Sequence, residues 1–143
     1  MFMGSYENSI DAKSRMIVPS KFREAFRGRC IFTRGFDQCL NMYTAEEWER
    51  FYEELKKLPR SSKDARNFIR HMFKNAVECE IDKQGRVTIP ARLRTYAGIE
   101  KELVTVGTGD YVEVWARNVW EETVEEEEPD GSQLAEGMEK YGI

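Results

Sequence analysis

Long apolar runs are absent from this sequence of 143 residues, and no stretch is long enough to span the hydrocarbon core of a bilayer. The N-terminal stretch Met1–Glu7 also lacks the basic region and following apolar segment of a secretion signal. We therefore expect a cytoplasmic protein that makes no membrane contact.

Residue types that bind metals or act as nucleophiles are scarce. Cys30, Cys39 and Cys79 are odd in number, and their spacing fits neither a disulfide framework nor a metal site. Their apolar neighbours instead favour small buried core residues. His71 is the only histidine and has no Cys or acidic partner at ligand spacing. Because no phosphate-binding loop or nucleophile elbow is present either, we expect no catalytic residues, no metal, no cofactor and no enzymatic activity.

An overall excess of positive charge is also missing, since the formal net charge is −4. The acidic residues are unevenly distributed, with nine acidic residues and one basic residue between positions 121 and 143. Removing these from the 26 acidic and 22 basic residues of the chain leaves 17 acidic and 21 basic residues, a net charge of +4 for residues 1–120. We interpret the acidic block as a solvated helix end and tail, so the net charge does not argue against a nucleic-acid partner.

An internal repeat organises the chain. Residues 11–19 read DAKSRMIVP and residues 82–90 read DKQGRVTIP. The identical pairs are Asp11 and Asp82, Arg15 and Arg86, and Pro19 and Pro90. With a one-residue shift the similarity continues to Tyr43 and Trp48 of the first copy, which align with Trp115 and Trp120 of the second. A repeat of this kind predicts two related structural units.

Each copy predicts the same order of elements. An extended segment (5–10; 77–81) leads into a turn rich in Asp and Gly, and a short run favouring a strand follows (16–18; 87–89). Pro19 and Pro90 are then expected at the first position of a short helix. A second hairpin (30–33 with 39–43; 102–106 with 111–115) completes each unit. The fold class is therefore mainly β with α, that is α+β.

Helices are expected after each hairpin. Thr44 and Glu47 fit a capping box that begins a helix ending near Leu58. Another helix starts near Ser62, and its apolar residues from Ala65 to Ala76 are interpreted as core packing. The domain boundaries are a first unit at 5–47 followed by helices to about 75, a second unit at 76–119, and an acidic C-terminal helix and tail at 120–143. The helix there is expected to reach about Glu127, and the chain after Pro129 is expected to be a mobile tail.

The pattern Asp-x-x-x-Arg-x-x-(Val/Ile)-Pro, present twice, carries the functional prediction. Arg15 and Arg86 follow the turns, and an arginine fork can bind two acceptors on a guanine edge. Lys13 and Lys83 lie on or beside the turns and suit phosphate. The short helices add basic residues that more often contact the DNA backbone: Lys21, Arg23, Arg92 and Arg94.

A bland alternative stands beside this interpretation, because a single Asp-x-x-x-Arg is a common solvated turn. Asp11 and Asp82 fit a loop-shaping role, in which each orients its own arginine through a charge-assisted hydrogen bond. Gly85, Pro19 and Pro90 also shape the loops. The first copy has Ser14 where the second has Gly85, so a required positive φ would either strain Ser14 or give the first turn a different shape.

The two motifs, the Met-Phe-x-Gly start, Cys39-Leu40-x-x-Tyr43 and Trp48 together resemble the MraZ family, to about residue 127. The resemblance implies two tandem AbrB-like swapped-hairpin units that form a pseudo-dimeric barrel flanked by helices. It also implies a nucleoid-associated transcriptional repressor of the division and cell-wall gene cluster. Such a regulator binds short G-rich promoter direct repeats in double-stranded DNA as a ring-shaped homo-oligomer. Arg15 and Arg86 are then the leading DNA contacts. The alternative is an AbrB-like antitoxin-type interaction module, whose acidic tail wraps a toxin.

Overall fold

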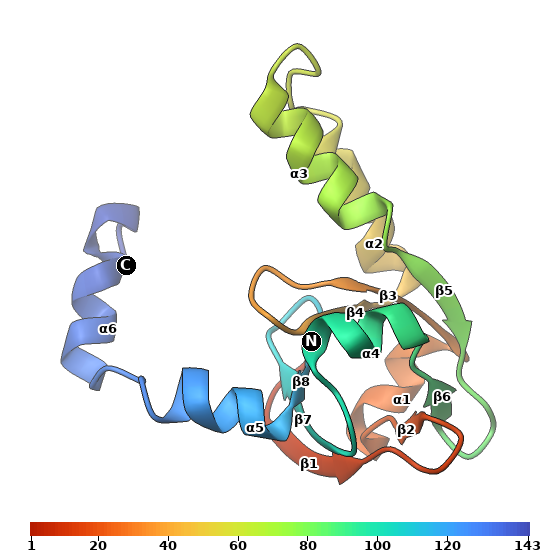
Figure 1. Ribbon diagram of the computed structural model, residues 1–143. Helices are drawn as coiled ribbons and strands as arrows, with labels where there is room; N and C mark the ends of the chain where they lie inside the picture. The colour runs from red at the N-terminus through yellow and green to blue at the C-terminus, as the bar shows by residue number, and fades with distance from the viewer.

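Two structural units interleave around one core in the computed structural model, which describes residues 1–143 (Figure 1). The first unit consists of β1 (Ser5–Ser9), β2 (Arg15–Ile17), α1 (Ser20–Phe26), β3 (Arg29–Arg34) and β4 (Leu40–Tyr43). The second consists of β5 (Val77–Glu80), β6 (Arg86–Thr88), α4 (Ala91–Ala97), β7 (Glu102–Gly107) and β8 (Val112–Ala116). Helices α2 (Ala45–Leu55) and α3 (Lys63–Phe73) lie between the units in sequence.

The sheet shows that each unit gives its first strand to the other. The six-stranded sheet has the order β1-β7-β8-β4-β3-β5, and β2 pairs with β6 in a separate two-stranded ribbon. Thus β1 of the first unit joins the β7–β8 hairpin of the second, while β5 joins the β3–β4 hairpin of the first. This exchange confirms the α+β class and the interleaved arrangement of tandem units.

The strand registers follow an internal twofold symmetry. In the ribbon, Arg15 lies opposite Thr88 and Ile17 opposite Arg86, with Met16 and Val87 paired at the centre. Since Met16 and Val87 occupy the same position in the two repeats, the symmetry axis passes between them. The pairing of β4 with β8 is centred in the same way on Asn41 and Glu113. The two loop motifs are therefore presented as symmetric partners.

Repeat-related residues fill the core. Met16 and Val87 are buried from the ribbon, Val18 and Ile89 from the chain after it, and Phe22 and Leu93 from the short helices; these six belong to one cluster of 18 buried residues. Burying an aliphatic or aromatic side chain of this size stabilises a fold by about 1.5–3 kcal/mol. Cys30 and Cys39 are buried and Cys79 is half-buried, all as free thiols, as expected for core cysteines.

The short helices begin one residue later than expected. Pro19 and Pro90 are N-cap residues with extended ψ angles of 135° and 140°, so α1 starts at Ser20 and α4 at Ala91. The prolines still set the chain direction where the ribbon meets each helix. Both helices then end in the left-handed region, at Arg27 and at Gly98.

Helices α2 and α3 form a hairpin that projects from the barrel (Figure 1). Thr44 Oγ1 accepts a hydrogen bond from the Glu47 backbone N–H, but the Glu47 carboxylate pairs with Arg50, so only half of the expected capping box forms. Helix α2 ends at Leu55, three residues earlier than predicted. Ser62 caps α3 as expected, through a hydrogen bond to the Ala65 backbone N–H.

The apolar face of α3 is less buried than the core-packing interpretation requires. Only Ala65 and Met72 of this helix are buried, whereas Phe68, Ile69 and Phe73 are half-exposed. The hairpin is held instead by aromatic contacts between its helices. The Trp48 and Phe73 ring centroids, for example, lie 4.9 Å apart.

The C-terminal residues leave the barrel as an arm. Helix α5 (Arg117–Trp120) continues into a π-helical turn, Glu121–Glu125, and a separate helix α6 (Gly131–Met138) follows. The tail expected after Pro129 therefore contains a helix, which begins at a capping box formed by Asp130 and Gln133. No helix of the chain combines the length and apolar character needed to cross a membrane.

Candidate nucleic-acid interface

The β2–β6 ribbon presents one polar face to solvent. Side chains alternate across a strand, and the burial of Met16 and Val87 directs their neighbours outward. The outward face carries Arg15, Ile17, Arg86 and Thr88. Because Arg15 and Arg86 are diagonal across the ribbon, standard strand dimensions separate their Cα atoms by about 8 Å.

Asp11 holds Arg15 in a fixed orientation. One carboxylate oxygen of Asp11 accepts hydrogen bonds from the backbone N–H groups of Lys13 and Arg15, at 2.9 and 3.0 Å. The other oxygen accepts from Arg15 Nε at 2.7 Å. The turn therefore fixes the carboxylate, and the carboxylate fixes the guanidinium through Nε alone. The two terminal nitrogens of Arg15 donate no hydrogen bond within the chain.

The second loop repeats this geometry. Asp82 accepts from the backbone N–H groups of Gln84 and Arg86 at 2.9 and 2.8 Å, and from Arg86 Nε at 2.7 Å. The Arg15 and Arg86 side chains are 26% and 33% exposed, so they are held yet accessible. This geometry fits the orienting role considered for the aspartates.

The aspartates remain ionised over a wide pH range. The Arg15 backbone N–H lowers the pKa of the Asp11 carboxyl below its ordinary value of 3.8, and the Arg15 side chain acts in the same direction. The Arg86 backbone N–H and side chain lower the pKa of Asp82 in the same way. Hydrogen bonds donated to the charged form cause both shifts.

The two loops have the same shape despite their different sequences. Ser14 has a φ of 60° and Gly85 a φ of 80°. Both residues donate a backbone hydrogen bond to the carbonyl of their own aspartate, at 2.9 Å. Of the two possibilities left by the sequence, Ser14 thus adopts the left-handed conformation, with the strain that a side chain brings there.

Each loop is braced by the other unit. The Val18 N–H donates to the Gly85 carbonyl at 2.8 Å, and the Ile89 N–H donates to the Ser14 carbonyl at 3.0 Å. Arg23 Nε donates to the Val18 carbonyl at 2.8 Å. This reciprocal bracing couples the two loops mechanically.

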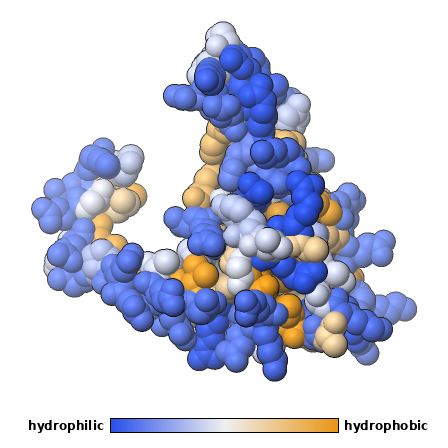
Figure 2. All heavy atoms as spheres, in the orientation of Figure 1, coloured by the Kyte–Doolittle hydropathy of each residue, from blue (hydrophilic) through white to orange (hydrophobic).

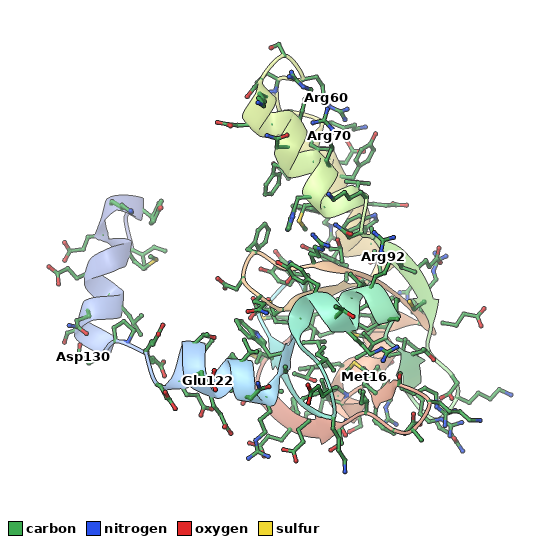
Figure 3. The ribbon with its side chains drawn as sticks, viewed as in Figure 1. Met16, Arg60, Arg70, Arg92, Glu122 and Asp130 are labelled. Carbon is green, nitrogen blue, oxygen red and sulfur yellow. The ribbon has the colours of Figure 1, made fainter.

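The basic residues of the short helices differ in position. Arg94 Nε donates to the Ile89 carbonyl at 3.0 Å, the counterpart of the Arg23 contact, so both arginines brace the ends of the ribbon. Arg92 is directed towards Asn75, with its terminal nitrogen 3.4 Å from the amide oxygen, at the base of the hairpin (Figure 3). Lys21 is exposed on α1. Lys13 and Lys83 are exposed at the loop tips, beside the arginines.

Arg15 and Arg86 line one open cleft of about 800 Å³. Arg27 and Arg29 also border it, together with carboxylates of β5, and Arg29 pairs with Glu78 at 2.8 Å. The structure thus brings the two predicted arginines together in a partly basic groove. The other predicted basic residues do not line this groove: Lys13, Lys83, Lys21, Arg23, Arg92 and Arg94.

Three further residues contribute to this surface although the sequence motif did not predict them. Ile17, 36% exposed, and Thr88 share the outward face with the arginines. Asn8 Nδ2 donates to the Ile17 carbonyl at 2.9 Å and supports the ribbon from β1. Strand alternation from Arg15 and Arg86 was the available signal for Ile17 and Thr88, but it becomes informative only once β2 is known to pair with β6.

Known proteins match this chain over its whole length. A family model described as "MraZ protein, putative antitoxin-like" matches residues 1–71 and again residues 72–140. A protein of Pediococcus pentosaceus named Transcriptional regulator MraZ is 46% identical over 143 residues, which cover all of both chains. A protein of the same name from Caldanaerobacter subterraneus subsp. tengcongensis is 44% identical, again over all of both chains.

Proposed function

This chain belongs to the MraZ family, and from that premise we propose that it regulates transcription by binding double-stranded DNA through the β2–β6 ribbon and its two loops. The observation that carries the proposal is the pair of matched arginines on the exposed ribbon face, each fixed by its own aspartate at 2.7 Å. A purely structural turn would have no use for a guanidinium that is held through Nε while both of its terminal nitrogens remain without a partner.

The dimensions of the ribbon suit the major groove, which admits a two-stranded β-ribbon. An arginine separation of about 8 Å corresponds to two or three base-pair steps of about 3.4 Å along one strand. Arg15 and Arg86 therefore contact bases within one short DNA segment, called a box below. The internal twofold symmetry presents them to the groove in opposite directions along the ribbon.

The free edges of the two guanidinium groups can read guanine. Each arginine keeps two coplanar terminal nitrogens, which match the O6 and N7 acceptors of a guanine in the major groove. Ile17 and Thr88 offer methyl groups to thymine beside them. Lys13, Lys83 and Lys21 supply charge to phosphates around the box, while Arg23 and Arg94 hold the ribbon ends that set this geometry.

Regulation follows from several boxes being occupied together. One ribbon buries little surface, so a single copy binds weakly. A ring-shaped homo-oligomer places several ribbons along short G-rich direct repeats and raises the effective concentration of each after the first has bound. Occupied repeats that overlap a promoter would repress it. The division and cell-wall gene cluster is the target that the family resemblance implies.

A binding titration tests the proposal. The labelled duplexes carry G-rich direct repeats or the same bases scrambled, and the variant is Arg15→Ala/Arg86→Ala. Lys56→Ala/Lys57→Ala removes the same two charges from an exposed part of α2 and its turn and serves as the matched control. We expect preference for the repeats in the wild type and the control, and its loss in the arginine variant with assembly unchanged. Equal binding by all three proteins would contradict the proposal.

A further inference from the structure

A basic stripe runs along the outer face of α3. We define it as Lys63, Arg66, Arg70 and Lys74, whose spacings of three, four and four residues place them on one side of a helix. None of the four forms an ion pair with a carboxylate. The stripe is about 16 Å long at 1.5 Å per residue. Figure 3 shows Arg70 on this outward face of the hairpin, and Figure 2 shows that face as hydrophilic.

Apolar side chains border the stripe on one flank. Ile69 and Phe73 lie between the stripe and the buried face of α3, and both are half-exposed. Tyr52 of α2 extends this strip, because its ring lies 5.6 Å from that of Phe73 and is 40% exposed. A surface with a basic stripe beside an apolar strip fits an acidic, amphipathic partner segment.

The C-terminal arm has that composition. We define the arm as residues 125–143, none of which is buried. It begins with the acidic block Glu125–Glu128. Leu134 and Met138 of α6 and Tyr141 of the 3₁₀ turn after it are each more than 40% exposed, and spacings of four and three residues place them on one side. Figure 2 shows apolar atoms on one side of this projecting arm. An isolated helix of eight residues is marginal in water, so α6 needs a surface to pack on.

The repeat shows that α6 lacks a partner that α3 has. Both helices follow the helix after a β-hairpin and come after a proline, Pro59 in one unit and Pro129 in the other. Helix α3 folds back on α2, where Phe51 and Phe68 lie 6.4 Å apart. Helix α6 instead stands away from the barrel and from the hairpin of its own chain (Figure 1). Its partner surface therefore comes from elsewhere.

We propose that the arm of one copy docks on the basic stripe and the Tyr52–Ile69–Phe73 strip of a second copy of this chain. Opposite charge favours the contact, since the arm holds seven acidic residues against one basic residue and the stripe holds four cations. The contact joins two different surfaces, so every copy offers one arm and accepts another. Such head-to-tail contacts propagate and close into a ring when the rotation allows.

DNA is a weaker candidate for the stripe. The hairpin projects from the side of the barrel away from β2 and β6, so a duplex seated on the ribbon does not reach it (Figure 1). Phosphates also make no use of an apolar strip. The proposed contact forms without DNA, and it rests on the ring-shaped homo-oligomer of the proposed function.

A charge exchange tests the docking on the full chain. Lys63→Glu/Arg70→Glu/Lys74→Glu reverses the stripe at three exposed residues, and Glu126→Lys/Glu127→Lys/Glu128→Lys reverses the arm. The third protein carries both sets. The control is Lys57→Glu/Lys101→Glu, which reverses two exposed charges outside the stripe, the strip and the arm. Sedimentation velocity measures assembly without DNA, and circular dichroism verifies the fold.

We expect wild type and control to assemble, each single reversal to sediment as one chain, and the combined variant to regain assembly. Assembly of wild type should weaken as salt rises, because exposed charges are screened beyond about 8 Å at physiological ionic strength. A single-chain wild type, normal assembly of either single reversal, or no recovery in the combined variant would overturn the proposal. So would a stripe reversal that assembles normally but loses DNA affinity, or a foreign protein that copurifies in equal amount on the arm. Repeat-specific DNA binding by the single-chain variants would separate this result from the proposed function.

Discussion

Exchanging the residues at the two equivalent loop positions tests the bracing between units. Gly85→Ser gives the second loop the residue of the first, and Ser14→Gly does the reverse. Gly85 has a φ of 80°, and a Cβ there would lie 2.3 Å from Arg23 Nε and 2.6 Å from its Cζ. The arginine must therefore move and give up its 2.8 Å hydrogen bond to the Val18 carbonyl.

Two contributions determine how much Gly85→Ser should lower the free energy of unfolding. A side chain in the left-handed region costs about 1 kcal/mol, and losing a charged donor to a carbonyl of buried Val18 costs about 1.5 kcal/mol. We expect Gly85→Ser to lower the free energy of unfolding by about 2–3 kcal/mol. Ser14→Gly removes strain of about 1 kcal/mol but adds freedom to the unfolded chain, so it should stabilise by only about 0.5 kcal/mol.

Urea unfolding at fixed protein concentration, followed by circular dichroism, measures both changes from the shift in midpoint at constant slope. Because the Val18 N–H donates to the Gly85 carbonyl and the Ile89 N–H to the Ser14 carbonyl, the double exchange, Ser14→Gly/Gly85→Ser, should depart from the sum of the two single values by about 0.5 kcal/mol or more. A loss below about 1 kcal/mol for Gly85→Ser would refute the assignment of Arg23 as a brace over the Gly85 loop. Destabilisation by Ser14→Gly would refute the strain assigned to Ser14.

Three further predictions concern charge. Asp11→Asn/Asp82→Asn removes the anions that orient the two arginines, so fluorescence anisotropy should show an affinity for the repeats that is about tenfold lower, with an unchanged dependence on salt concentration. A weaker dependence of affinity on salt concentration would contradict this prediction. Hydrogen bonds lower the pKa values of both aspartates below 3.8, so both stay ionised as the pH falls from about 8 to 5 and DNA affinity should stay constant over that range. Affinity should weaken only as the pH falls through the pKa values of the folded protein. A midpoint above pH 5 in the same assay would refute this assignment. Burial raises the pKa of Glu113, although the carboxylate accepts a hydrogen bond from Trp115. Its negative charge therefore opposes folding at a pH above the pKa in the folded protein, and Glu113→Gln should raise Tm at pH 7 but not at pH 4. Equal Tm shifts at both pH values would contradict this prediction.

Much of the fold could be predicted because the repeat constrains it. Asp11 and Asp82 set the turns, and the prolines after the ribbon mark the short helices to within one residue. The internal repeat also gave the candidate arginines, Arg15 and Arg86. What it did not give was their spatial relation, since pairing of β2 with β6 joins positions 71 residues apart and depends on the exchange of β1 and β5.

The predictions for α3, for Arg23 and for the C-terminal segment differ from the structure because a local sequence pattern does not determine tertiary packing. Phe68 and Phe73 have helical spacing, yet both stay half-exposed. Phe73 packs on Trp48 within the projecting hairpin, and Phe68 stacks on Phe36 of the β3–β4 loop. Arg23 is basic and sits on a short helix, but its Nε serves a backbone carbonyl, which no sequence pattern reveals. For α6, the capping pair Asp130 and Gln133 was a readable signal that the acidic composition obscured.

The central claim is that Arg15 and Arg86 read guanine edges, and substituting 7-deazaguanine in the preferred duplex tests it most directly. This base lacks the N7 acceptor but pairs normally. We expect the wild type to lose about 1–3 kcal/mol of binding free energy for each guanine that an arginine reads, and Arg15→Ala/Arg86→Ala to bind both duplexes equally. An equal loss in wild type and variant, or no loss in either, would contradict base reading by these arginines.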